Sequence, residues 1–218
     1  RDRLLVDGLP LMSGLNYTYG ISAIPGTLID NIYISQGLAS VIQGHEALTG
    51  QINIELKEKS EDEKLFLNLY MNSFMAKQAN IDYNYKIGNW RSITSFHTTQ
   101  PGVKIDKNND NFIDFPLITK YSIYNKWIYS NPTNPLFSII TLRYLNEKRV
   151  GGEKNYNEEI KGSTSIYGQT IDYSQPEIHL KSTYKINDNN NLILQSAISK
   201  HNQNSFFEGF RNKKVINS

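Results

Sequence analysis

The chain has 218 residues, with 23 basic and 21 acidic side chains, a net charge of +2 and no cysteine. The balanced charge argues against a nucleic-acid-binding protein, which usually carries a basic face, and the lack of cysteine excludes a disulfide framework and any cysteine-based zinc site. No apolar run approaches the roughly 18 residues of a membrane-spanning helix. The alternating strands of a transmembrane barrel would give an equally polar average, so a barrel stays open.

Residues 1–57 are rich in glycine and turn signals, and they predict a small mixed α/β unit. Short apolar strands are expected at residues 4–6, 32–34 and 51–56. The pair Asp7-Gly8 predicts a turn with positive φ. The segment PGTLIDN, residues 25–31, predicts a short helix with proline near its start. The chain begins at Arg1 and enters an apolar stretch at once, so we expect it to be a piece of a longer protein.

After a charged connection at residues 58–64, the hydrophobic pattern changes to a period of two. Residues 79–87 are the strictest case, because the odd positions from Ala79 to Ile87 are apolar and the even positions from Asn80 to Lys86 are polar. This pattern predicts a strand with one apolar and one polar face. Further strands are expected at residues 65–75, 90–99, 121–129, 136–147, 178–186 and 192–201.

The lengths of these strands and their connections favour an up-and-down meander. Strands of roughly 9–12 residues exceed the usual 5–6 and fit the 9–11 that a tilted strand needs to cross a bilayer. Short connections at residues 88–89, 131–135 and 187–191 alternate with long ones at 100–119 and 148–175. Outer-membrane barrels have this alternation of short turns and long loops, although a soluble sandwich with shorter strands could share it.

Several motifs follow one another in the first 57 residues. The residues that carry them are Val6-Asp7-Gly8-Leu9-Pro10, Ile24-Pro25, residues 28–32, Gly37, Ser40-Val41, Gly44, Ala47, Gly50-Gln51-Ile52-Asn53-Ile54 and Lys57. In this order they resemble the plug domain of the TonB-dependent outer-membrane receptors, and the form GQINIELK looks most similar to receptors of the Bacteroidetes type. The sequence departs from the family at Leu38, where the family has proline, and at Gln51, where it has a second glycine.

The resemblance implies a mostly β fold in two parts. Residues 1–60 would be the C-terminal half of a plug domain, a small α/β portion. Residues 61–218 would be the N-terminal part of a transmembrane β-barrel domain, an antiparallel up-and-down meander.

The resemblance also implies a function, which is energy-coupled uptake of a scarce nutrient across the cell outer membrane of a Gram-negative bacterium. The ligand would be an iron chelate, cobalamin or another large solute, a small molecule or a glycan. The protein would not be an enzyme. Its partners would be outer-membrane lipid and the TonB energy-coupling complex, reached through a TonB box outside these residues, and no nucleic acid and no cofactor is expected.

Two groups of residues are candidate binding sites. Asn16, Tyr17 and Tyr19 follow the first motif, and plug loops of related receptors point toward the substrate, so these side chains could donate hydrogen bonds and stack on a ligand. The alternative is an ordinary turn. Asp106, Asn108, Asp110 and Asp114 have the 1, 3, 5 and 9 spacing of a calcium loop. Leu117 stands where such a loop has its bidentate glutamate, so a polar loop without a metal is the alternative.

Aromatic side chains near the expected strand ends indicate a girdle at the membrane surfaces, as in barrels. They are Trp90, Tyr121, Trp127, Tyr129 and Tyr144. The main alternative to a transporter is a soluble or surface-anchored all-β binding module, such as an adhesin. A carbohydrate-active enzyme would need a carboxylate pair that the sequence does not reveal. The face pattern distinguishes the first two, because a barrel exposes its apolar face to lipid and a sandwich buries it.

Overall fold

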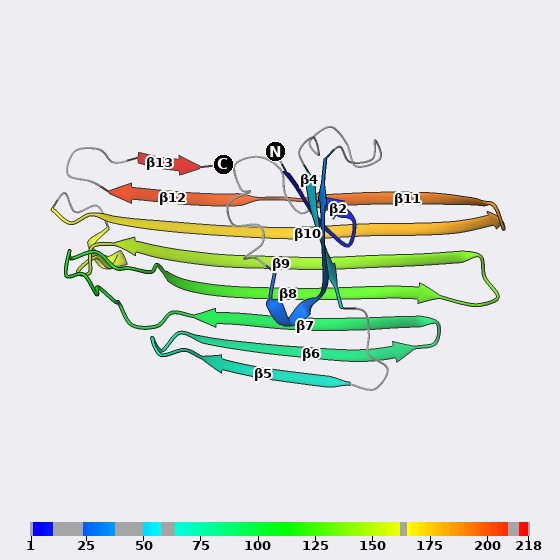
Figure 1. Ribbon diagram of the computed structural model, residues 1–218, viewed down its shortest axis with the longest axis horizontal. Helices are drawn as coiled ribbons and strands as arrows, with labels where there is room; N and C mark the ends of the chain where they lie inside the picture. The colour runs from blue at the N-terminus through cyan, green and yellow to red at the C-terminus, as the bar shows by residue number, and fades with distance from the viewer. Residues whose placement is uncertain are drawn as a thin grey trace.

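The computed structural model describes residues 2–10, 24–37, 50–57, 64–161, 165–208 and 214–217. These residues form two β-sheets (Figure 1). The smaller sheet belongs to the first 57 residues, which we call the N-terminal unit, and the larger sheet comprises the strands that follow. Within the described ranges, no helix combines the length and the apolar character that crossing a membrane requires.

The N-terminal unit is a four-stranded mixed sheet with the strand order β2-β1-β4-β3. Its strands are β1 (Asp2–Val6), β2 (Leu9–Pro10), β3 (Ile29–Gln36) and β4 (Gly50–Leu56). Strands β1 and β4 are parallel, and the other two pairs are antiparallel. The three strands expected from the sequence are therefore confirmed, each with a longer span.

The turn between β1 and β2 follows directly from its sequence. Asp7 has a φ of 52° and Gly8 a φ of 78°. These left-handed values belong to a two-residue type I′ hairpin turn, for which Asp-Gly is a preferred pair. The Gly8 N–H donates to Asn53 Oδ1 at 2.9 Å, which ties the turn to β4. The expected positive φ is confirmed.

The helix expected at residues 25–31 is wrong in extent. Only Gly26–Leu28 forms a helical turn, the 3₁₀ helix η3, and Ile29 already begins β3. Strand β3 pairs with β4 from Ile29 opposite Leu56 onward, so pairing in the sheet overrides the local helix signal. In its described residues the N-terminal unit is thus strand with one 3₁₀ turn, and the expected α-helical contribution is absent.

The large sheet is a nine-stranded antiparallel meander. Its strands are β5 (Leu65–Met71), β6 (Lys77–Ile87), β7 (Trp90–Gln100), β8 (Leu117–Ser130), β9 (Leu136–Gly152), β10 (Gly168–Asn187), β11 (Asn190–Ser199), β12 (Asn202–Glu208) and β13 (Lys214–Asn217). The mostly β fold with an antiparallel meander is confirmed. Strands β8, β9 and β10 have 14, 17 and 20 residues, longer than expected, because backbone pairing continues through polar segments that the apolar alternation does not mark.

The first strand of the large sheet is shorter than expected. It ends at Met71 rather than near residue 75, because Asn72 closes a turn there. The Asn72 Oδ1 accepts the N–H groups of Phe74 and Ala76, both at 3.0 Å, and Met75 has a φ of 65°. Strand β6 then starts at Lys77.

Strands β11 and β12 lie end to end along one edge of β10 (Figure 1). The break falls at Lys200 and His201, next to Pro176 of β10. The Pro176 carbonyl accepts the Lys200 N–H at 3.1 Å, so the N–H that proline lacks would have pointed to the same side. The strand expected at residues 192–201 is therefore confirmed as β11, which ends two residues earlier, whereas β12 and β13 were not expected.

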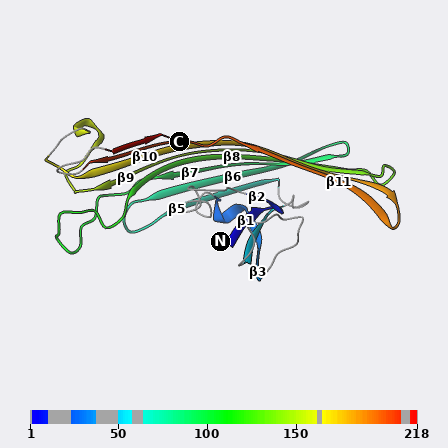
Figure 2. The same ribbon diagram turned by 90° about the horizontal axis from the view of Figure 1, so that it is seen from above.

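Short and long connections alternate between the two ends of the sheet, as expected. Residues 88–89, 131–135 and 188–189 connect strands at one end, and residues 72–76, 101–116 and 153–167 connect them at the other (Figure 1). Figure 2 shows that the loop at residues 101–116 curls toward the side of the sheet on which the N-terminal unit lies.

The N-terminal unit packs on one face of the large sheet (Figure 2). Most of its buried apolar residues form one cluster with Ile93 of β7 and Tyr124 of β8; the members from the unit are Leu4, Val6, Ile24, Leu28, Ile54 and Leu56. We call the face toward the N-terminal unit the inner face, and the opposite face the outer face.

Candidate functional site: the two faces of the large sheet

The large sheet exposes apolar side chains on its outer face and buries many polar ones on its inner face. On β6, Ile81 and Tyr83 are 41% and 49% exposed, whereas Asn80 and Asp82 are each 3% exposed. The expected orientation is thus confirmed in this strand, since the apolar row points away from the N-terminal unit and the polar row lies beneath it. Lys86, at the strand end, is exposed. A soluble sandwich would have the reverse polarity.

The same outer face is apolar along the other strands. Its exposed apolar residues include Leu65, Leu67, Leu69, Phe96, Ile123, Leu142, Ile178, Leu192, Leu194 and Ile198. Polar residues on this face are paired with one another. Asn125 Nδ2 donates to Thr94 Oγ1 at 2.7 Å, and the hydroxyl oxygens of Ser138 and Ser182 lie 2.9 Å apart. Pairing removes most of the cost of placing these groups in an apolar medium.

Aromatic side chains form two rows on the outer face. Near the short-turn end, Trp127 packs edge-on against Tyr85 and Trp90, with ring centroids 5.2 Å and 6.2 Å apart, and Trp90 contacts Tyr129 at 5.1 Å. Tyr121 and Tyr144 lie further along β8 and β9 and are also exposed. Two aromatic rows separated by an apolar band are typical of a sheet that spans a bilayer.

The inner face contacts the N-terminal unit through an ion pair. Lys126 Nζ of β8 lies 3.2 Å from Asp7 Oδ2, and the Lys126 side chain is almost fully buried. The other oxygen of Asp7 accepts the Leu56 N–H at 3.0 Å. The Asp-Gly turn thus positions one carboxylate that binds both β4 of its own sheet and β8 of the large sheet.

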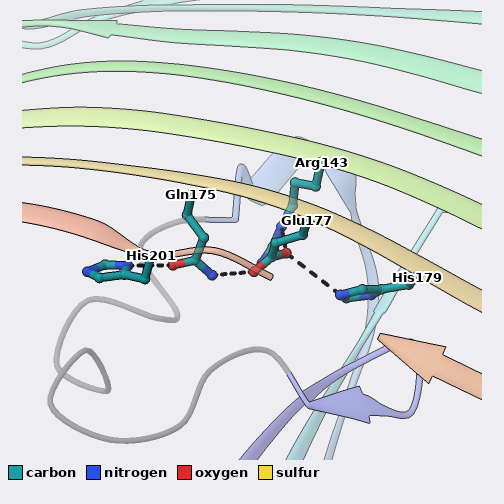
Figure 3. A network of polar contacts seen from close by, with 5 residues as sticks. All are labelled: Arg143, Gln175, Glu177, His179 and His201. Carbon is teal, nitrogen blue, oxygen red and sulfur yellow. Dashed lines mark hydrogen bonds and ion pairs between the residues drawn. The ribbon is translucent and has the colours of Figure 1, made fainter. Parts of the chain in front are cut away.

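A larger network lies beside this contact on β9 and β10 (Figure 3). The Glu177 carboxylate receives hydrogen bonds from the Arg143 guanidinium and the Gln175 amide, and it is 3.8 Å from His179 Nε2. Gln175 Oε1 in turn lies 2.8 Å from His201 Nδ1. The Glu177 side chain is 1% exposed and that of Arg143 8%. Buried charges of this kind persist only when they are paired.

A second ionic cluster lies nearer the long loops. Glu147 of β9 is fully buried, lies 3.4 Å from Lys120 Nζ on β8 and contacts the Arg149 guanidinium. The inner face therefore carries charged groups of both signs along neighbouring strands.

Two small cavities lie between the N-terminal unit and the large sheet. One, of about 10 Å³, is lined by residues that include Val6, Asp7, Tyr124 and Glu177. The other, of about 20 Å³, is lined by residues that include Leu9, Thr141 and Lys181. Each has room for about one water molecule. The contact between the two sheets thus combines an apolar cluster with an ion pair and small cavities that have room for water.

The expected ligand residues Asn16, Tyr17 and Tyr19 lie outside the described residues. The expected calcium residues all lie in the 101–116 loop, where their oxygens accept backbone N–H groups. Asp106 receives the N–H groups of Asp110 and Asn111 at 3.1 and 3.2 Å, and Asp114 receives that of Lys107 at 3.1 Å. Asn108 donates to Asp110 at 2.8 Å. In the described part of the chain, no three acidic or histidine side chains are grouped to hold a metal ion.

Calcium binding by this loop stays a prediction. If Asp106, Asn108, Asp110 and Asp114 take up the ion, millimolar calcium should raise the melting temperature of the full-length protein, and the Asp110→Asn variant should lose most of that rise. The reason is that a ligand bound only by the folded state stabilises that state. A melting temperature that does not respond to calcium would leave these residues with the turn-forming hydrogen bonds alone.

Sequence reasoning missed the buried charged residues of the inner face. Lys126, Arg143 and Glu177 were not singled out, because each is a lone charge in a strand otherwise judged by its apolar residues. A usable signal was present, since strict alternation places Lys120, Lys126 and the apolar Tyr124 on one face.

The comparisons with known proteins concern the fold. No family model matches this sequence, and no curated protein matches it. The structure is similar to the open form of the ferric-catecholate import receptor Fiu from E. coli K12, with a TM-score of 0.65 and 14% identity over 94% of this chain and 32% of that one. It is also similar to the siderophore receptor PiuA from Acinetobacter baumannii, with a TM-score of 0.63 and 14% identity over 94% of this chain and 30% of that one. This chain spans about a third of both, and the large sheet has the fold of part of a barrel wall.

Proposed function

We propose that the chain is part of a TonB-dependent receptor in the outer membrane of a Gram-negative bacterium. Residues 1–60 would be the C-terminal half of its plug domain, and residues 61–218 the first part of its barrel. The observation that carries the proposal is the polarity of the large sheet, which exposes an apolar outer face and buries a charged inner face against the N-terminal unit. Lipid is the medium in which an exposed apolar face of this kind is stable, because contact of the same face with water would be unfavourable.

The contact between the two sheets includes a buried ion pair beside its apolar cluster, and this polar part suits a plug that must move. A solute binding at the long-loop end and the TonB complex acting from the other side would bias the same plug equilibrium. Displacing the N-terminal unit separates Asp7 from Lys126 and uncovers groups that water can solvate. An apolar contact of equal area would resist separation more strongly. Transport of this kind involves no covalent chemistry.

An iron chelate is the solute that the comparisons favour over cobalamin and other large ligands. The two similar structures are named as a ferric-catecholate import receptor and a siderophore receptor. The GQINIELK motif supports a receptor of the Bacteroidetes type. A soluble adhesin-like module is disfavoured, because it would leave the whole outer face of the sheet in water.

The test uses two single-cysteine labels on β6 of the full-length protein in lipid bilayers. A label at Ile81, on the outer face, should be reached by a lipid-soluble quencher and shielded from a water-soluble one. A label at Lys86, on the inner face, should show the opposite preference, since polar residues of a barrel face its lumen. Equal access of the water-soluble quencher to both labels would reject membrane insertion and favour the soluble module.

A further inference from the structure

The long-loop end of the sheet contains a cavity of about 310 Å³ between the 72–76 turn and the segment 99–118. Three of its lining residues, Gln78, Thr99 and Ile118, are inner-face positions of their strands. The 101–116 loop, which supplies much of the lining, curls to the same side (Figure 2). Phe74, Gly102, Val103 and Phe115 also line it.

The lining contains exposed apolar side chains that lipid does not explain. Val103 and Phe115 are 58% and 57% exposed, yet they belong to a loop beyond the strands rather than to the outer face. Exposed apolar groups gathered around a hollow on a water-facing surface indicate a binding site. The rings of Phe74 and Phe115 are stacked with centroids 5.9 Å apart and form an aromatic wall.

The cavity is uncharged throughout its lining. Its polar groups are neutral. The Gln78 amide can orient a ligand through hydrogen bonds, and so can the Thr99 hydroxyl, which also lies 3.0 Å from His97 Nε2. A charged ligand group buried in such a lining would have no oppositely charged partner, so its burial would be costly. At about 310 Å³ the space is at the lower end of the roughly 300–1,000 Å³ of ligand pockets, so it suits one group of a larger solute.

The walls of the cavity are held in place by close backbone contacts. A Cβ atom added at Gly102 would lie 2.0 Å from the Phe74 carbonyl oxygen, so glycine permits the loop to touch the turn. Val103 N–H also donates to that carbonyl oxygen at 2.9 Å. On the far side, Lys104 Nζ donates to the carbonyl oxygens of Lys154 and Tyr156 at 2.8 and 2.5 Å, which ties the loop to its neighbour. A preformed pocket loses little entropy when it binds a ligand.

We infer that this cavity is the subsite for an uncharged aromatic group of the transported solute, with Phe74 and Phe115 stacking on its ring. The inference rests on the proposed function in one respect, which is that the ligand of the cavity is the transported solute. Binding to the cavity itself needs neither TonB nor an energised membrane, and it can be measured separately.

The experiment titrates the full-length protein in lipid nanodiscs with 4-fluorophenol, followed by ¹⁹F NMR. The phenol is uncharged at pH 7, since phenolic groups titrate near pH 10. The parent should bind it saturably, and Phe115→Ala should weaken binding about three- to tenfold, the effect of losing one aromatic contact. The matched control is Phe112→Ala in the same loop, because Phe112 contacts Tyr167 instead of lining the cavity, and it should bind as the parent does.

A second probe tests the charge preference. The anion 4-fluorobenzoate should bind at least about tenfold more weakly than the phenol, even though Lys107 Nζ lies 5.2 Å from the Phe74 ring centroid. Failure of the parent to bind the phenol, equal weakening by both alanine variants, or equal binding of the anion would each overturn the inference. Selective binding in a protein that fails the quencher test would keep the cavity and reject transport, whereas membrane insertion without selective binding would reject the cavity alone.

Discussion

Replacing Glu177 with leucine should lower the free energy of unfolding of the full-length protein by about 3–5 kcal/mol. The substitution leaves the Arg143 guanidinium buried with no carboxylate and removes the acceptor of the Gln175 amide. A lone buried charge is far less stable than a paired one, since little water can reach it. Urea titration of the protein refolded into lipid vesicles measures the loss.

A double substitution separates the pair from the rest of the network. Arg143→Met with Glu177→Leu replaces both charges by apolar groups, and it should recover most of the stability, because a buried ion pair is often no better than apolar packing of similar volume. The exposed pair Lys185–Asp188, at 2.7 Å, provides a control. Asp188→Asn should cost less than about 1 kcal/mol. A double variant as unstable as the single one would show that Glu177 acts through something other than neutralising Arg143.

The sequence predicted a strand well where the two faces of the strand have different surroundings, because apolar and polar residues then alternate. Residues 79–87 alternate strictly because one face is apolar and exposed and the other is polar and mostly buried, and their orientation was predictable. The Asp7-Gly8 turn was predictable for a local reason, since few residue pairs accept positive φ at both positions.

Other elements were not predictable, because their cause lies elsewhere in the chain. Residues 29–31 carry a helix signal but pair with β4, which the local sequence does not reveal. The first half of β10, residues 168–177, has polar residues on both faces. The break before β12 is set by Pro176 on the neighbouring strand. Backbone pairing decides these spans, and it leaves little trace in apolar periodicity.

The candidate site follows the same division. That the inner face would be polar was predictable from alternation, but which charges meet was not. Lys126 is more than a hundred residues from Asp7 in the chain, and their contact depends on how the small sheet packs on the large one. The cavity at the long-loop end likewise arises from the turn at Asn72 and the close approach of Gly102, two features of tertiary structure.

Ile178 lies within the apolar band of the outer face. It pairs with Leu142 on β9 and Ile198 on β11, and all three are exposed on the outer face. Leu142 also pairs with Asn125, which lies between Trp127 and Tyr121 on β8. The Ile178 level is thus between the two aromatic rows, where a bilayer is most apolar.

The substitution Ile178→Lys should therefore lower the free energy of unfolding in lipid vesicles by about 2–4 kcal/mol, the cost of a lysine near the bilayer midplane. Ile186→Lys is the matched control, because Ile186 is likewise an exposed isoleucine of the same strand, next to the turn at residues 188–189. It should cost only about 0–1 kcal/mol, since the penalty falls toward the membrane surface. In a soluble sheet both residues would face water, and both changes would stay within about 0.5 kcal/mol. Equal and small effects at the two positions would therefore contradict a lipid-facing outer face and reject the proposed transport function.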